Sequence, residues 1–209
     1  IESAISQETL DAFIATGTIH IIVISGFNMT LLAGTLLRLG TRLANRMRAL
    51  IPAMLVLVGY ALLVGGGAPV VRATIMVSAS LLAYLVGRPY AVENALAASV
   101  AIMTFFAPRL LWDVSFQLSA MSTLGLVVLA PRATKWLGAR LERWFADRKA
   151  ALLAGILDDL LIASLAAQLT TIPIIAHHFQ RISLISPLTN LLILPIQPCI
   201  MILGGFATL

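Results

Sequence analysis

Long apolar stretches recur along this chain, and they limit the folds open to it more than any other feature. A helix rises about 1.5 Å per residue, so crossing about 30 Å of hydrocarbon takes about 20 mostly apolar residues. The chain is 60% hydrophobic and only 11% charged, whereas soluble domains carry about 25% charged residues. The sequence therefore predicts an all-α, polytopic membrane bundle of about seven spans.

The predicted spans cover residues 20–39, 51–64, 69–86, 92–107, 113–130, 151–175 and 187–209. The second and fourth are short for a full crossing. Gly65, Gly66 and Pro69 predict a tight hairpin between two spans, because glycine adopts unusual backbone angles and proline suits a first helical turn.

The flanking segments complete the predicted organisation. Residues 1–18 carry an apolar stripe typical of a short amphipathic helix that lies on the outer, periplasmic side of the inner membrane. A membrane domain over 19–209 follows it. Residues 132–150 are too polar to cross and predict a helix lying on the cytoplasmic surface, where lipid contact is favoured over DNA contact. A start without methionine and an end inside an apolar stretch predict an excerpt of a longer protein.

The basic residues predict the orientation. If the loop after the first span is cytoplasmic, all but three of the 14 Lys and Arg residues lie on the cytoplasmic side. The exceptions are Arg72, Arg109 and Arg181. This asymmetry predicts an N-terminus on the outer side.

Polar and helix-breaking residues inside the spans are the first candidates for function, because they are expensive in lipid, with helix packing as the alternative explanation. Arg72 and Asp113 each fall in the first turn of a span, at the same side of the membrane, and predict a partly buried ion pair. Gln117 lies one turn after Asp113, on the same face. The candidates are His20, Ser25, Gly26, Asn28, Arg72, Asp113, Gln117, Ser119, Gln168, Pro173 and Asn190.

Familiar catalytic and metal-binding motifs are missing from the sequence. It has no Gly-rich phosphate loop, no His-Glu-x-x-His zinc helix and no Gly-x-Ser-x-Gly elbow. Cys199 is the single cysteine, so neither an internal disulfide nor a thiolate metal site can form. We therefore expect no catalytic residues, no metal and no cofactor.

Several motifs in order carry a resemblance to a known family. His20-Ile-Ile-Val-Ile-Ser-Gly-Phe-Asn28 and Leu111-Trp-Asp-Val-Ser-Phe-Gln-Leu-Ser119 are the longest, and Val71-Arg72-Ala73 lies between them. Segments 168–173, 178–179 and 190–195 extend the likeness. With these motifs the chain resembles the ComEC competence family, the inner-membrane DNA-uptake channel of naturally transformable bacteria. Asn28 stands where many relatives have a histidine.

The resemblance implies a multi-pass domain of the bacterial inner membrane that conducts single-stranded DNA into the cytoplasm, with the candidate residues lining the passage or supporting it. The implied partners are single-stranded DNA, membrane lipids, other DNA-uptake components and a nuclease domain of the same protein. The residues alone leave alternatives open. One Arg and few aromatic residues within the spans suit a small-molecule or lipid transporter equally well. An intramembrane enzyme built on Ser25 is a third hypothesis.

Overall fold

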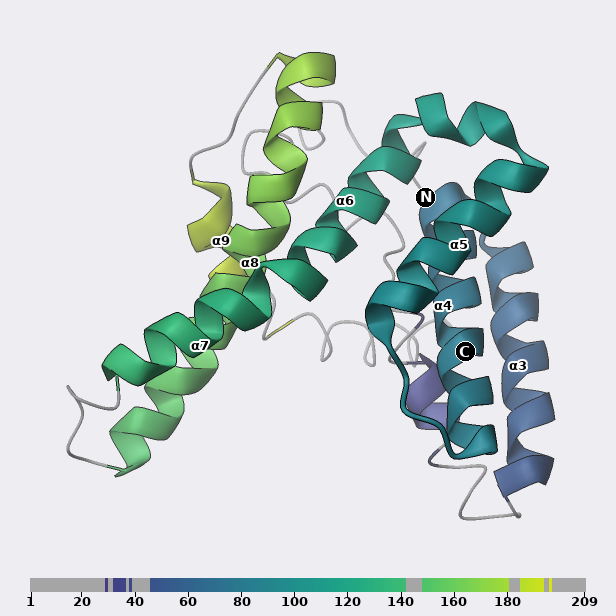
Figure 1. Ribbon diagram of the computed structural model, residues 1–209, viewed down its shortest axis with the longest axis horizontal. Helices are drawn as coiled ribbons and strands as arrows, with labels where there is room; N and C mark the ends of the chain where they lie inside the picture. The colour runs from purple at the N-terminus through teal and green to yellow at the C-terminus, as the bar shows by residue number, and fades with distance from the viewer. Residues whose placement is uncertain are drawn as a thin grey trace. The chain divides into compact units, whose positions relative to one another are not determined.

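Helices are the only regular elements in the part of the chain that the structure describes. The computed structural model describes Met29, 32–36, Arg38, 46–141, 148–180, 185–193 and Ile196. The elements are α3 (Arg46–Leu63), α4 (Ala68–Val86), α5 (Val92–Phe106), the 3₁₀ helix η3 (Pro108–Trp112), α6 (Val114–Val128), α7 (Ala130–Leu141), α8 (Arg148–Phe179) and α9 (Ser186–Ile193) (Figure 1). The all-α prediction is confirmed for this part of the chain, which contains no strand.

The chain divides into two compact units, and the point of division falls within the residue range of α6. The α3–α5 unit contains α3, α4, α5, η3 and α6 as far as Ala120. The α7–α9 unit contains α6 from Met121 onward, with α7, α8 and α9. The candidate residues that the structure describes are therefore divided between the two units.

In the α3–α5 unit, α4 packs against both α3 and α5. The predicted hairpin before α4 is confirmed, because Gly65 and Gly66 have φ values of 97° and 59°. These are left-handed conformations that glycine adopts readily. Pro69 lies in the first turn of α4, where its missing N–H leaves no helical bond unmade.

Small and aliphatic side chains form the contact between α3 and α4. Leu57 on α3 is completely buried, and Ala61, Val77 and Leu81 are less than a tenth exposed. In a membrane, such close contacts stabilise helix pairs by van der Waals attraction, since lipid is as apolar as the side chains themselves. Hence α4 holds a fixed place between its neighbours, and its side chains are positioned accordingly.

Within the described residues, three helices are long and apolar enough to cross a membrane, which corrects the prediction of about seven spans. They are Ala68–Val86, Val114–Trp136 and Leu161–Phe179. Leu50–Leu63, within α3, and Val92–Phe106 are shorter apolar stretches, and Pro108 follows the second of them. Most of the first and last expected spans, 20–39 and 187–209, lies outside the described residues.

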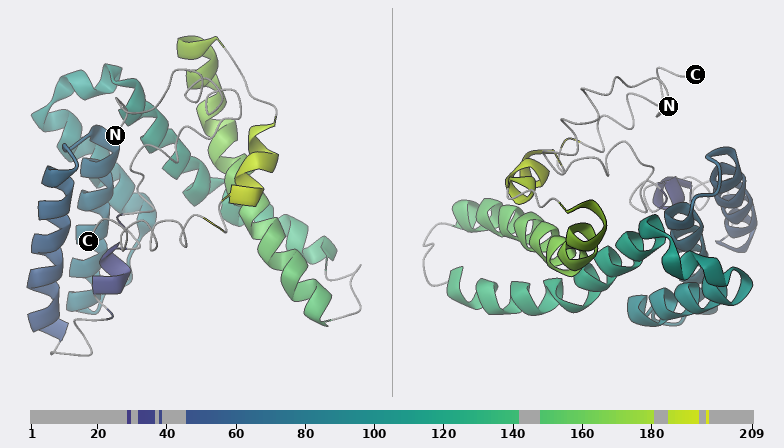
Figure 2. Two further views of the ribbon diagram at one scale, coloured as in Figure 1. Left: turned by 180° about the vertical axis from the view of Figure 1, so that it is seen from behind. Right: turned by 90° about the horizontal axis from the view of Figure 1, so that it is seen from above.

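In the α7–α9 unit, α8 packs against α7 and α9 (Figure 2). Helical bonding continues from α6 into α7, because the Leu129 N–H donates to the Gly125 carbonyl at 2.8 Å and the Leu129 carbonyl accepts from Ala133. Helix α7 and the start of α8 occupy most of the predicted surface helix over 132–150, whose membrane position stays a prediction. Pro173 lies inside α8 without ending it.

Candidate functional site: two buried polar clusters

A buried arginine joins α4 to α6 in the α3–α5 unit. Arg72 is only 5% exposed. Its Nε and Nη2 atoms donate to the Ser119 hydroxyl oxygen at 3.1 and 2.9 Å, and its Nη1 lies 3.0 Å from the Met76 sulfur. We call Arg72, Met76 and Ser119 the arginine cluster. All three nitrogens of the guanidinium thus have a contact, as a charge in this setting requires.

The predicted Arg72–Asp113 ion pair is wrong. No ion pair joins these two side chains, both of which lie in the described part of the chain. Instead, Asp113 Oδ1 accepts the Phe116 N–H at 2.7 Å and so caps the first turn of α6. A carboxylate is favoured at this position because the first N–H groups of a helix lack helical partners.

Gln117 also binds the backbone at the start of α6. Its Nε2 donates to the Leu111 carbonyl at 2.6 Å, which ties η3 to the following helix. Asp113 and Gln117, which were predicted to share one face, therefore both bind backbone groups close by in the sequence. Both side chains hold the junction between η3 and α6.

Tyr90 adds a residue that the sequence analysis did not identify. Its hydroxyl donates to the Met76 carbonyl at 3.1 Å, so it contacts the helical turn that follows Arg72. Burial raises the pKa of the Tyr90 phenol above its ordinary value, and the nearby Arg72 charge acts in the opposite direction. No spacing rule links residues 72 and 90, because the contact depends on the loop that follows α4.

A second polar cluster joins α8 to α9 in the α7–α9 unit. The Ser164 hydroxyl oxygen accepts one bond from Gln168 Nε2 at 3.3 Å and another from Asn190 Nδ2 at 3.2 Å. Ser164 and Asn190 are 6% and 8% exposed. We call these three residues the amide cluster. Asn190 Oδ1 is buried and has no hydrogen-bond partner among the described residues.

The sequence analysis predicted two members of the amide cluster and missed the third. Gln168 and Asn190 are brought together as candidates, but only through Ser164. Ser164 lies four residues before Gln168, on the same helical face, and this spacing was the available signal.

Close contact between α6 and α8 brings the backbones together beside this cluster. A Cβ atom at Gly125 would lie 2.3 Å from the Ala166 carbonyl oxygen and 2.5 Å from Thr170 Oγ1. Thr170 Oγ1 also donates to the Met121 carbonyl at 2.7 Å. Only glycine fits at position 125, as in other tight helix crossings within membranes.

Pro173 lies near this contact on α8. It lacks an N–H, so the Leu169 carbonyl has lost its usual helical donor. In the preceding turn, the Thr171 hydroxyl donates to the Ala167 carbonyl at 3.0 Å. This hydrogen bond lies within α8. A role for Pro173 in a passage stays a prediction.

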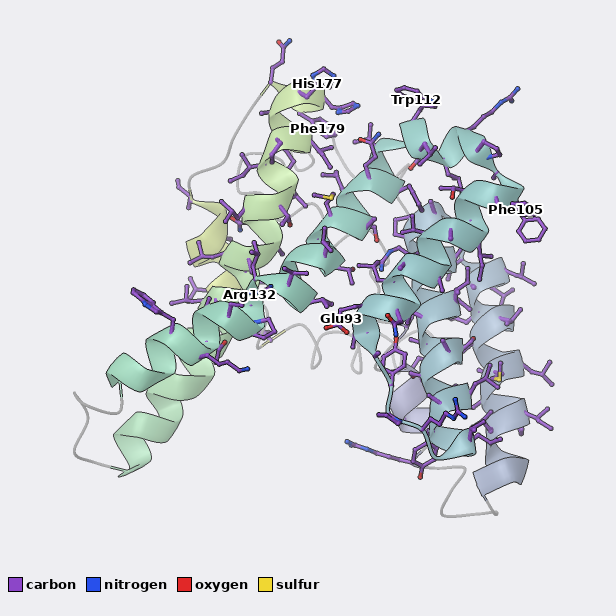
Figure 3. The ribbon with its side chains drawn as sticks, in the orientation of Figure 1. Glu93, Phe105, Trp112, Arg132, His177 and Phe179 are labelled. Carbon is purple, nitrogen blue, oxygen red and sulfur yellow. The ribbon has the colours of Figure 1, made fainter. Side chains whose placement is uncertain are left out.

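The remaining candidates, His20, Ser25, Gly26 and Asn28, lie outside the described residues. The described residues contain no group of three His, Cys, Asp or Glu side chains that could hold a metal ion. His177 lies at the end of α8 (Figure 3). Its ring centroid is 5.0 Å from that of His178.

The arginine cluster and the amide cluster share one structural role. Each uses hydrogen bonds between side chains to join helices from different parts of the sequence. In membranes such bonds are worth on average about 0.6 kcal/mol, and up to about 2 kcal/mol. Apolar helices of spanning length, joined at a few buried polar points, define an α-helical membrane-protein domain.

Comparisons with known proteins identify the family. The model of the competence protein family matches residues 2–209, so the chain belongs to that family. ComE operon protein 3 of Bacillus subtilis (strain 168) is 29% identical over 204 residues, which cover 97% of this chain and 24% of that protein. An uncharacterized protein of Aquifex aeolicus (strain VF5) is 33% identical over 117 residues, covering 56% of this chain and 28% of that protein.

These matches confirm the predicted family resemblance. The chain spans about a quarter of the length of the curated relatives it matches. No solved structure matches it.

Proposed function

We propose that this chain is a membrane-embedded channel domain that conducts single-stranded DNA into the cytoplasm during natural transformation. Membership of the competence protein family supports a role in DNA uptake. So does the similarity to ComE operon protein 3 along nearly the whole chain. The helices of spanning length supply the membrane part of the proposal.

One structural observation carries the proposal furthest. Arg72 is the fifth residue of α4, a helix long enough to span, and is bound to Ser119 on α6. A cation in a membrane-spanning helix is energetically costly in lipid. Such residues usually line a transport pathway or bind the helices around it. The helices around a DNA passage must hold a defined spacing without packing it shut. A polar bond between two such helices provides that spacing.

The domain lies in the inner membrane with several crossings and with its N-terminal part on the outer side. Its partners are single-stranded DNA, lipids, other DNA-uptake components and a nuclease domain of the same protein. In the α3–α5 unit the polar side chains assigned to the lining of the passage are Gln117 and Ser119, and we expect this part of the protein to catalyse no reaction.

Transformation by substituted proteins tests the proposal. We expect Arg72→Ala and Gln117→Ala to insert normally and to lower transformation by at least about tenfold, the effect of about 1.4 kcal/mol at the transport step. Arg88→Ala is the control for the first and Ser115→Ala for the second, because Arg88 and Ser115 are exposed. Insertion is measured by the amount of protein in washed membranes.

Two outcomes would contradict the proposal. Full transformation by correctly inserted Arg72→Ala and Gln117→Ala proteins removes the lining assignment. Uptake of a small solute or a lipid by vesicles containing the domain, with no DNA uptake in the same vesicles, identifies a different kind of transporter.

A further inference from the structure

Large apolar side chains are exposed where α5 passes into α6. Phe105, Phe106 and Trp112 are 81%, 79% and 83% exposed, and Leu111 is 52% exposed. Figure 3 shows Phe105 and Trp112 projecting away from the helices. We call these four side chains the aromatic tip. The rings of Phe105 and Phe106 meet edge to face, with centroids 5.4 Å apart. Large apolar side chains this exposed on a folded domain mark a contact with another apolar phase.

The backbone of the aromatic tip is firmly held, so its exposure does not come from a loose loop. The Ala107 N–H donates to the Met103 carbonyl at 2.9 Å, and the Leu110 N–H donates to the Ala107 carbonyl at 3.0 Å. Gln117 Nε2 binds the Leu111 carbonyl from the other side. The tip is therefore a built feature that faces outward.

Helix α5 is too short to cross the hydrocarbon layer by itself. Helix α5 has 15 residues, which at about 1.5 Å each is shorter than about 30 Å of hydrocarbon. Its Ser99 and Met103 are buried against the rest of the unit, while Ile102 is 45% exposed. The tip extends the apolar surface past the end of α5 and leads directly into α6, a helix of spanning length.

We propose that the aromatic tip inserts into the interfacial layer of the lipid bilayer, with Trp112 at the level of the headgroups and Arg109 directed toward lipid phosphate. Tryptophan is enriched in this layer because one end of its ring is apolar and the other carries a donor. An exposed arginine can bury its stem there and keep its charge in water. Arg109 is exposed and lies within the tip.

Lipid fits the aromatic tip better than single-stranded DNA does. A DNA-binding groove combines several cations with aromatic faces, whereas Arg109 is the only charged residue between positions 94 and 112. Leu111 adds an aliphatic surface on which bases do not stack. The proposal rests on the membrane placement of α6 and is independent of the molecule transported.

Depth-dependent fluorescence quenching tests the proposal. The chain with Trp136→Phe and Trp144→Phe retains Trp112 alone and is reconstituted in vesicles of phosphatidylethanolamine and phosphatidylglycerol. We expect lipids brominated near the glycerol backbone to quench Trp112 at least about twofold more than lipids brominated near the chain ends. Leu55→Trp in a tryptophan-free chain is the control, because Leu55 is 68% exposed in the middle of α3 and should show the opposite order.

A second chain protects the test against a local folding defect. Phe105→Trp in the tryptophan-free background should show the same shallow quenching as Trp112. Quenching of Trp112 mainly by deep bromines, or by none, overturns the proposal. Protection of Trp112 from iodide on addition of single-stranded DNA, without quenching by lipid bromine, would assign the tip to nucleic acid instead. Either result leaves the proposed transport function to be judged by transformation.

Discussion

The arginine cluster and the amide cluster bury side chains to a similar extent but satisfy them differently. Arg72 is 5% exposed and Asn190 is 8% exposed. All three Arg72 nitrogens have contacts, whereas Asn190 Oδ1 has none among the described residues. An unpartnered buried charge costs far more than one unpaired amide oxygen, which costs about 1–3 kcal/mol. A folded protein can therefore leave the second unsatisfied but must satisfy the first.

The largest expected effect tests whether the backbone contact beside the amide cluster is as tight as the structure indicates. Gly125→Ala would place a methyl group 2.3 Å from the Ala166 carbonyl oxygen, so α6 and α8 must separate. We expect a loss of about 3 kcal/mol in the free energy of unfolding, typical of a severe overpacking change. The measurement is SDS-induced unfolding in mixed micelles, followed by circular dichroism.

Gly59→Ala is the matched control for this change. Gly59 lies within α3, and a Cβ atom there would have no neighbour within 4 Å. Because alanine favours helix more than glycine by up to about 1 kcal/mol, the control should be neutral or slightly stabilised. Equal stability of the two variants would show that α6 and α8 lie farther apart than described.

The second-largest effect is expected in the arginine cluster. Ser119→Ala removes the oxygen that accepts from both Nε and Nη2 of Arg72 and leaves the buried guanidinium with the Met76 sulfur. Hydrogen bonds to charged groups contribute about 1.5–3 kcal/mol, so we expect a loss of about 2 kcal/mol in the same unfolding assay. Ser115→Ala, one turn earlier on α6 and exposed, should change stability little.

A double-mutant cycle checks the cause of that loss. Arg72→Met removes the charge together with its hydrogen bonds. In the Arg72→Met background, Ser119→Ala should then cost much less, because the bonds it breaks are already absent. An undiminished cost in that background would show that Ser119 stabilises the unit through other contacts.

A smaller effect is expected from the neutral side. Ser164→Ala removes the acceptor shared by Gln168 Nε2 and Asn190 Nδ2. Bonds between neutral side chains in membranes average about 0.6 kcal/mol each, so the expected loss is about 1 kcal/mol. Ser80→Ala is the control, since the Ser80 hydroxyl binds only a carbonyl of its own helix among the bonds described. A loss larger than that of Ser119→Ala would reverse the ranking of the two clusters.

The same contrast explains what the sequence could and could not predict. Apolar length predicted helices around Arg72, Ser119 and Gln168, because hydrophobic pattern is a local property. Pairing Arg72 with Asp113 failed because the argument used charge and membrane side alone. The N–H groups at the start of α6 compete for the same carboxylate and lie closer to it.

Other contacts depended on geometry that no local pattern contains. The contact of Gly125 with Ala166 joins residues far apart in the sequence, as does the bond of Ser164 with Asn190. Small residues are common in apolar helices, so their presence does not identify which pair meets. Such contacts require the helix crossing itself to be known.

The smallest expected effect separates the two clusters most sharply. Asn190→Leu removes the amide nitrogen that donates to Ser164, but it also removes the buried oxygen that has no partner among the described residues. The lost bond to Ser164 is worth about 0.6 kcal/mol, and removal of the unpartnered buried oxygen offsets that loss, so we expect a change within about 0.5 kcal/mol. The same unfolding assay measures it, with Asn190→Ala as the comparison that adds a cavity. A loss above about 2 kcal/mol for Asn190→Leu would mean that Oδ1 does have a partner in the membrane, such as bound water. The amide cluster would then resemble the arginine cluster in being fully satisfied.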